Sequence, residues 1–315
     1  MSAPILSIVS AVYDKARHLP VLLDNLRGQA DFGGEVEFVF ADDASTDGSA
    51  DLLEAEARTD PRIRLLRNAE NRGPAIRLNQ AAAAARGRWL LPVDADDRLS
   101  ANAVAVFLKV AQEREVDLVF ARSKRGAEPR DLPAAPRVTL TDDPMLLAAK
   151  RRIVRMGYLA LAEIWREAGG ADEGIFIQDQ SLPLRLGSVA RRAAYIEHTA
   201  YWLSTRDDTS LSRNTAQQHH DRFILMSRML DLDLPGATRQ AIERQRVSAW
   251  WKMNRYGTNG RADALVAYLG NRMFRRGLSL HQRARAEADF AALEGVRRIP
   301  DQMEEPDRVA SRAHS

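Results

Sequence analysis

The 315-residue sequence contains no cysteine. This absence excludes a disulfide framework, a metal site built on thiolates and a cysteine nucleophile. The sequence also lacks any apolar run close to the roughly 20 residues that span a bilayer. No basic segment precedes the apolar stretch at 5–12, so we expect no signal peptide. Together these absences predict a cytoplasmic protein.

Two common phosphate-binding signatures are missing as well. Neither G-x-x-x-x-G-K-[ST] nor G-x-G-x-x-G occurs, which counts against P-loop and dinucleotide-binding folds. A sugar-phosphate nucleotidyltransferase is disfavoured because residues 13–17, which follow the first apolar run, contain no glycine. The net charge of +3 is too small to require a nucleic-acid partner. We expect none, although the basic excess at 239–285 keeps nucleic-acid binding as a weaker alternative.

The hydrophobic pattern predicts an α/β fold. Continuous apolar runs, as expected of strands covered on both faces, occur at residues 5–12, 36–41, 63–66, 89–93 and 116–121. Amphipathic helical patterns separate them, for example Leu19, Leu22, Leu23 and Leu26 on one helical face. Alternating strands and helices predict a mainly parallel, doubly wound sheet flanked by helices.

The second half of the sequence is organised differently. Residues 128–136 are polar and rich in proline, which predicts a loop, and after Ser212 the sequence becomes basic and typical of helices. We therefore predict a catalytic domain at 1–213, a basic helical C-terminal extension at 214–299 and a disordered tail at 300–315.

Two acidic segments follow predicted strands. Ligands of such sheets bind beyond the carboxyl ends of the strands. Asp94 and Asp96 alternate, so in an extended segment their carboxylates can face one side and hold Mg²⁺ or Mn²⁺. Asp97 could support them. The alternative is a solvated acidic turn that caps a helix starting near Ser100.

The other acidic segment is Asp42-Asp43, which follows the second predicted strand. These carboxylates could accept hydrogen bonds from a nucleobase edge and from ribose hydroxyls. The alternative is again structural, because Ser45 and Asp47 are typical of the start of a helix.

Four segments, in order, resemble the family 2 glycosyltransferases of the GT-A fold. They are residues 7–14, 40–49 (the family's hDDxSxDxS/T block), 71–81 (NxGxxxxxNxA) and 87–97 (GxahhhhDxDD). The resemblance implies a Rossmann-like GT-A domain that binds a nucleoside-diphosphate sugar. It further implies that Asp42, Asp43, Arg77 and Asp94 contact this donor, and that Asp94 and Asp96 bind Mn²⁺ or Mg²⁺.

A fainter resemblance continues further along the chain. Residues 165–173 are similar to the family's f.eiGgfDe turn, and residues 176–186 to its EDxxLxhRh motif. By this resemblance Asp179 is the general base that deprotonates the acceptor hydroxyl in an inverting, metal-dependent transfer. The alternative for Asp179 is a helix N-cap.

Three features depart from the family pattern. Gln178 stands where the family usually has Glu, and Pro183 lies inside a predicted helix, where only the first turn tolerates it. The histidine that many members carry before an SxS motif is absent. Arg206 occupies that stretch and could bind the diphosphate instead; a solvated loop arginine is the alternative.

The resemblance also implies a biological setting, the assembly of a surface or exported polysaccharide, with a carbohydrate or lipid-linked acceptor. Arg272, Arg275 and Arg276 accompany apolar residues in one predicted helix, which has either a solvated basic face or a peripheral contact with the inner membrane face. A non-enzymatic alternative is a glycan- or nucleotide-binding protein that kept this fold and lost turnover. We expect no metal at the adjacent His219 and His220, which point apart on a helix.

Overall fold

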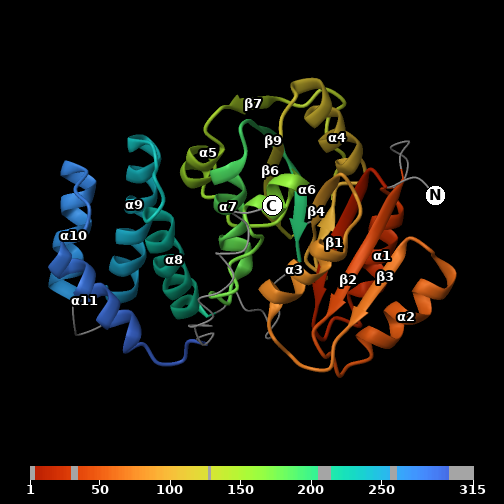
Figure 1. Cartoon of the computed structure of the whole chain (residues 1–315), viewed down its shortest axis with the longest axis horizontal. Helices are drawn as coiled ribbons and strands as arrows, with labels where there is room; N and C mark the ends of the chain where they lie inside the picture. The colour runs from red at the N-terminus through yellow and green to blue at the C-terminus, as the bar shows by residue number, and fades with distance from the viewer. Residues whose placement is uncertain (1–3, 30–34, 127–128, 205–213, 256–260, 298–315) are drawn as a thin grey trace, which may run out of the picture.

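The computed structural model describes residues 4–29, 35–126, 129–204, 214–255 and 261–297. Within these residues one nine-stranded sheet has the strand order β3-β2-β1-β4-β8-β6-β9-β5, with β7 paired to β9. Helices flank the sheet, and the C-terminal helices form a further layer at one end of the molecule (Figure 1). The predicted α/β fold with C-terminal helices is confirmed.

The first four strands form the parallel half of the sheet. Their bounds are Leu6–Val12 (β1), Val36–Asp42 (β2), Ile63–Arg67 (β3) and Trp89–Pro92 (β4). The helices that connect them are Leu19–Arg27 (α1), Ser49–Thr59 (α2) and Pro74–Ala84 (α3). Every residue of β2 is buried, and the four leucines of α1 face the core. Both agree with the pattern of apolar residues in the sequence.

The second half of the sheet mixes strand directions. Its strands are Arg98–Leu99 (β5), Leu118–Arg125 (β6), Val138–Thr141 (β7), Tyr158–Leu161 (β8) and Ala193–Leu203 (β9). The pair β6–β9 is parallel, whereas β4–β8, β6–β8, β5–β9 and β7–β9 are antiparallel. The prediction of a mainly parallel sheet is therefore wrong for this half. The sequence pattern could not reveal these directions, because a buried apolar strand has the same composition in either orientation.

The helices of this half are Ala103–Arg114 (α4), Pro144–Arg151 (α5), Ala162–Glu167 (α6), Gln178–Gln180 (η2, a 3₁₀ turn) and Leu182–Val189 (α7). Two local predictions agree with the structure here. Pro183 lies in the first turn of α7, where its missing N–H removes no helical hydrogen bond. Residues 129–136 contain no helix or strand, as predicted for a loop.

The C-terminal layer consists of Thr215–Leu230 (α8), Gly236–Asn254 (α9), Arg261–Phe274 (α10) and Leu280–Ala291 (α11). In Figure 1 it lies at the opposite end of the molecule from β3 and α2. Leu225 and Met226 of α8 belong to the main core, whereas Phe223 packs with Trp250 in a second, smaller core. Helix α8 therefore joins the two cores. The domain boundary at 214 stays a prediction, and the predicted tail at 300–315 lies outside the described residues.

The parallel register brings both acidic segments to one edge of the sheet. Val12 pairs with Asp42, and the N–H of Asp43 donates to the carbonyl of Val12 at 2.8 Å. Pro92 pairs with Val9, so the segment after β4 emerges beside the end of β1. Among the described helices, none combines the length and the hydrophobicity that a membrane span requires.

Candidate functional site

A cavity of about 420 Å³ opens at this edge of the sheet. It is bordered by the segments that follow β1, β2 and β4, by η2, and by one side of α8. Of the predicted site residues that the structure describes, Asp43, Asp94, Asp96 and Asp179 line it. Segments far apart in the sequence thus place four carboxylates in one space, which is the arrangement that the motifs predicted.

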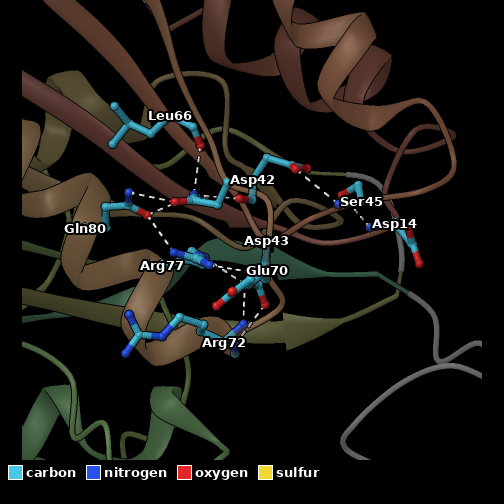
Figure 2. A network of polar contacts seen from close by, with 11 residues as sticks. Asp14, Asp42, Asp43, Ser45, Leu66, Glu70, Arg72, Arg77 and Gln80 are labelled. Atoms are coloured by element: carbon cyan, nitrogen blue, oxygen red, sulfur yellow. Dashed lines mark hydrogen bonds and ion pairs between the residues drawn. The ribbon is translucent and has the colours of Figure 1, made fainter.

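Asp43 lies at one end of the cavity, where hydrogen bonds fix its carboxylate. Its carboxylate accepts hydrogen bonds from the backbone N–H groups of Arg72 (2.8 Å) and Gly73 (2.9 Å). The Nε of Arg77 donates to it at 2.7 Å in an ion pair that is almost fully buried. Figure 2 shows Arg77 and the backbone of Arg72 converging on this carboxylate. Asp43 therefore holds the start of α3 against the end of β2.

Arg77 lies behind Asp43. Its guanidinium also donates to the carbonyl of Glu70 and to Gln80, and Arg77 is not among the described residues that line the cavity. A direct contact between Arg77 and a donor, which the resemblance implied, has no support in this geometry. Its contacts are those of a residue that positions Asp43.

Asp42 and the residues after it form hydrogen bonds within their own segment. The Oδ2 of Asp42 accepts from the N–H of Ser45 at 3.1 Å, while Oδ1 is buried with no hydrogen-bond partner. The Oδ1 of Asp47 accepts from the N–H of Ser49, the first residue of α2. The N-cap of α2 is Gly48, and the Oγ of Ser45 accepts from the N–H of Asp14 at 3.0 Å rather than from the helix. The interpretation as a helix start is therefore correct for Asp47 and wrong for Ser45. Asp43 remains its candidate ligand-binding carboxylate.

The acidic segment after β4 contributes three cavity-lining carboxylates. The Nζ of Lys15 lies 2.6 Å from Oδ2 of Asp96. The Oδ1 of Asp97 accepts from the N–H of Ser204 at 2.8 Å, and the N–H of Asp94 donates to Oη of Tyr201 at 2.9 Å. The segment does not cap a helix near Ser100, because β5 follows it and α4 begins at Ala103. The alternative of a capping turn is therefore wrong.

The negative charges of this segment repel one another. Burial, followed by the negative charges of Asp97, Asp179 and Asp96, raises the pKa of Asp94 well above its usual value. Burial, together with the charge of Asp96, raises the pKa of Asp97 to about 7. A cation in the cavity would relieve this repulsion, as Lys15 does in part.

These residues fit a hard divalent cation. Carboxylate oxygens are the ligands that Mg²⁺ and Mn²⁺ prefer, and Mg²⁺ commonly uses one or two carboxylates plus substrate phosphates. No group of three or more His, Asp or Glu side chains suited to a metal occurs in the part of the chain that the structure describes. A metal held by Asp94 and Asp96 would thus take its remaining ligands from a bound diphosphate and water. His219 and His220 form no such group either.

Asp179 lies in η2, at the side of the cavity nearest α8. Only 7% of its surface is exposed, and its Oδ1 has no hydrogen-bond partner. Its Oδ2 accepts from Nη1 of Arg155 at 3.3 Å. Burial raises the pKa of Asp179, and the positive charges of Arg155 and Arg222 oppose that rise. The N-cap of α7 is Ser181, so the interpretation of Asp179 as its N-cap is wrong.

The structure adds cationic residues that the sequence analysis did not select. Lys15, Arg155, Arg222 and Arg297 line the same cavity. They come from separate segments, and single arginines carry no periodic signal that could have assigned them to a site. Arg206, the predicted ligand of the diphosphate, lies outside the described residues.

Comparison with known proteins identifies relatives of this chain. Residues 7–159 match the sequence model of "Glycosyl transferase family 2". The succinoglycan biosynthesis protein ExoO of Rhizobium meliloti is 32% identical over 146 residues, which cover 44% of this chain and 41% of that protein. The chain spans less than half the length of this protein and of other curated relatives that it matches.

Two solved structures share the fold. Staphylococcus aureus TarS 1–349 in complex with UDP-GlcNAc superposes with a TM-score of 0.66 at 18% identity, covering 90% of this chain and 89% of TarS. The mannosyltransferase PcManGT of Pyrobaculum calidifontis, in complex with GDP-Man and Mn²⁺, gives 0.60 at 18% identity, covering 92% and 81%. At this level of identity the likeness concerns the fold alone.

The buried pair of Asp43 and Arg77 leads to a stability prediction. Replacing Arg77 with methionine leaves the Asp43 carboxylate buried without its charged partner, so Arg77→Met should reduce the free energy of unfolding by about 3–5 kcal/mol. Arg67→Met is the matched control, because Arg67 pairs with Asp51 at the surface and its replacement should hardly change the free energy of unfolding. Urea denaturation measures both, and equal losses would contradict a positioning role for Arg77.

Proposed function

We propose that this chain, whose residues 7–159 match the model of the family 2 glycosyltransferases, transfers a sugar from a nucleoside-diphosphate sugar to an acceptor hydroxyl. The observation that carries the proposal is the single cavity that gathers Asp43, the carboxylates of Asp94 and Asp96, and Asp179. These groups are the parts that such a transfer needs: a nucleoside contact, a site for diphosphate charge and a base.

The nucleoside binds at the end of the cavity formed by Asp43 and residues 71–74. The Asp43 carboxylate is fixed by backbone N–H groups and Arg77, so it can accept a hydrogen bond from a base edge or a ribose hydroxyl without reorganising. Asp42 supports this segment from the interior of the sheet. The solved complexes of TarS with UDP-GlcNAc and of PcManGT with GDP-Man support a nucleotide sugar as the ligand of this fold.

Asp94 and Asp96 would hold Mn²⁺ or Mg²⁺ at the middle of the cavity. Such an ion, when bound, neutralises charge on a departing diphosphate. The Mn²⁺ in the PcManGT complex supports this assignment. Lys15 forms an ion pair with Asp96 and lines the same cavity, so its ammonium group can also contact a phosphate. We propose Arg206 as a further diphosphate ligand, from the family motif alone.

Asp179 acts as the general base. Its Oδ1 is buried and makes no hydrogen bond, which leaves it available to the proton of an acceptor hydroxyl. As that proton moves to Asp179, the acceptor oxygen bonds to the anomeric carbon and the bond from that carbon to the diphosphate breaks. A single displacement inverts the anomeric centre and needs no enzyme nucleophile. Arg155 orients the carboxylate through its contact with Oδ2.

The acceptor enters from the side of α8. Gln218 and Arg222 of this helix line the cavity, so the proposed C-terminal extension contributes to the site rather than being a separate appendage. The similarity to the succinoglycan biosynthesis protein ExoO supports assembly of a surface or exported polysaccharide. The acceptor would then be a growing carbohydrate, free or lipid-linked.

The surface of α10 supports a peripheral membrane contact. Five large apolar side chains are exposed along this helix: Leu265, Val266, Leu269, Met273 and Phe274. Their spacing places most of them on one helical face, and Arg272, Arg275 and Arg276 lie beside them. This combination is typical of helices that lie at an anionic lipid surface, such as the inner face of a bacterial membrane.

Nucleotide binding should require a divalent ion. Calorimetry should detect UDP or GDP binding with Mn²⁺ or Mg²⁺ and little binding in EDTA, because a cation must lie between Asp96 and the diphosphate. Asp96→Ala should bind as weakly with Mn²⁺ as the wild type does in EDTA, whereas the exposed control Asp233→Ala should bind normally. Equal affinity with and without the ion would contradict the metal assignment.

Asp179→Asn separates an active transferase from a binding protein. The variant should keep its affinity for donor and metal but lose about 10²- to 10⁴-fold in transfer rate, the usual effect of a missing acid–base group. Asp142→Asn, at an exposed position, is the control. If wild type binds the donor but transfers sugar to no acceptor, Gln178 in place of the family's Glu would favour the alternative, a glycan- or nucleotide-binding protein without turnover.

The membrane proposal is tested by co-sedimentation with vesicles that contain anionic lipid. Wild type should sediment with them at low salt and be released as salt screens the arginines. Val266→Asp should weaken the association, while Val21→Asp, which replaces an exposed valine on α1, should not. Association that is equal in both variants, or absent from wild type at low salt, would leave α10 as a solvated basic helix.

A further inference from the structure

A cluster of positive charges lies at and behind the wall of the cavity that holds Asp179. Its members, called the basic cluster below, are Arg152 and Arg155 after α5, Arg222 on α8, Lys252 and Arg255 at the end of α9, and Arg297 after α11. They come from four separate parts of the chain. Arg155, Arg222 and Arg297 line the cavity directly.

The segment after α11 is tied to this wall by specific contacts. The N–H of Arg297 donates to Oε1 of Gln217 at 2.6 Å, and its carbonyl accepts from Nε2 of Gln217 at 3.0 Å. The guanidinium of Arg297 lies 4.9 Å from the ring centre of Phe176, which also lines the cavity. Arg297 is therefore held at the wall of the cavity by its backbone and by Phe176.

The positive charges of the cluster act on one another. Burial, followed by the charge of Arg152, lowers the pKa of Arg222, although Asp179 opposes this. Burial, with the charges of Arg152, Arg222 and Arg255, lowers the pKa of Lys252. Burial, then the charges of Arg222, Lys252 and Arg255, lowers the pKa of His219 to about 4, so His219 is neutral at pH 7. Arg155, Arg222 and Lys252 are half-buried, whereas the other three members are exposed. Holding like charges this close together costs stability, and an anionic ligand would recover it.

The position of the cluster indicates which substrate carries the anion. The nucleoside end and the Asp94–Asp96 pair belong to segments after β1, β2 and β4, on the other side of the cavity from α8. Asp179 adjoins the cluster: its Oδ2 accepts from Nη1 of Arg155 at 3.3 Å, and Oε1 of the next residue, Gln180, accepts from Nε of Arg222 at 3.3 Å. A group bound by Arg222 is thus next to the base, where the acceptor must lie.

We propose that the basic cluster binds a phosphate group of the acceptor, so that the sugar is transferred to a phosphate-bearing molecule. Planar guanidinium groups suit this task, because each can donate two parallel hydrogen bonds to phosphate oxygens. The phosphate would be either a phosphodiester of a polymer or the diphosphate of a lipid-linked glycan. The inference rests on the proposed function only in taking Asp179 as the base that faces the acceptor.

The test measures binding of two phosphate-bearing probes to the full chain with the donor site filled. Calorimetry in saturating UDP and Mn²⁺ would use a short glycerol-phosphate oligomer, as a phosphodiester, and geranyl diphosphate, as a lipid diphosphate. At least one probe should bind, and its affinity should fall as salt increases. The probe that binds more tightly identifies the source of the phosphate.

Variants connect this binding to the cluster. Arg222→Gln and Arg297→Gln should each lower the affinity for the probe by about tenfold or more, as expected for a lost charged hydrogen bond. The affinity for UDP should stay unchanged. Arg297 is exposed, so its variant keeps the test valid if Arg222→Gln fails to fold. Arg283→Gln, on the surface of α11, is the matched control and should bind like wild type.

Three results would overturn the proposal. Wild type that binds UDP with Mn²⁺ but neither probe would contradict it and leave the transferase function standing. A probe that binds in the absence of UDP but not in saturating UDP would assign the cluster to the donor diphosphate instead. Equal losses in Arg297→Gln and Arg283→Gln would reduce the binding to general surface charge. Conversely, probe binding without any UDP binding would support the anion site and contradict the donor assignment.

Discussion

Electrostatic repulsion among carboxylates is the constraint on which the site depends. Asp94, Asp97 and Asp179 are drawn into a largely buried cavity with Asp96, and burial together with mutual repulsion raises the pKa of Asp94 well above its usual value. The chain offsets this cost locally, with Lys15 on Asp96 and Arg155 on Asp179. A site with excess negative charge at its centre favours a divalent cation and, through it, a diphosphate.

The parallel half of the sheet creates this concentration of charge. β1, β2 and β4 end at one edge in register, so the residues that follow them must share that edge whatever their separation in the sequence. The buried pair of Asp43 and Arg77 then fixes the start of α3 against the end of β2. The same framework therefore makes one end of the cavity rigid, suited to a nucleoside, and the middle electrostatically strained, suited to an ion.

The sequence predicted the features that depend on local pattern. Continuous apolar runs identified the first four strands, and short motifs selected Asp43, Asp94, Asp96 and Asp179, which the fold brings together. It did not predict the orientation of the later strands or the position of Arg77 behind Asp43. It also missed Arg222 and Arg297, because an arginine in a basic helix or a terminal segment has no pattern of its own. These residues reach the cavity only through the packing of α8 and the Gln217–Arg297 contact.

A structure of the full chain with UDP and Mn²⁺ bound tests the central claim most directly. The account predicts that Mn²⁺ contacts the carboxylates of Asp94 and Asp96 and the diphosphate oxygens. The nucleoside should lie against Asp43, and Asp179 should remain open to the acceptor side. A diphosphate held by Arg155 and Arg222, with no metal at Asp94 or Asp96, would contradict both the metal assignment and the division of the cavity into donor and acceptor ends.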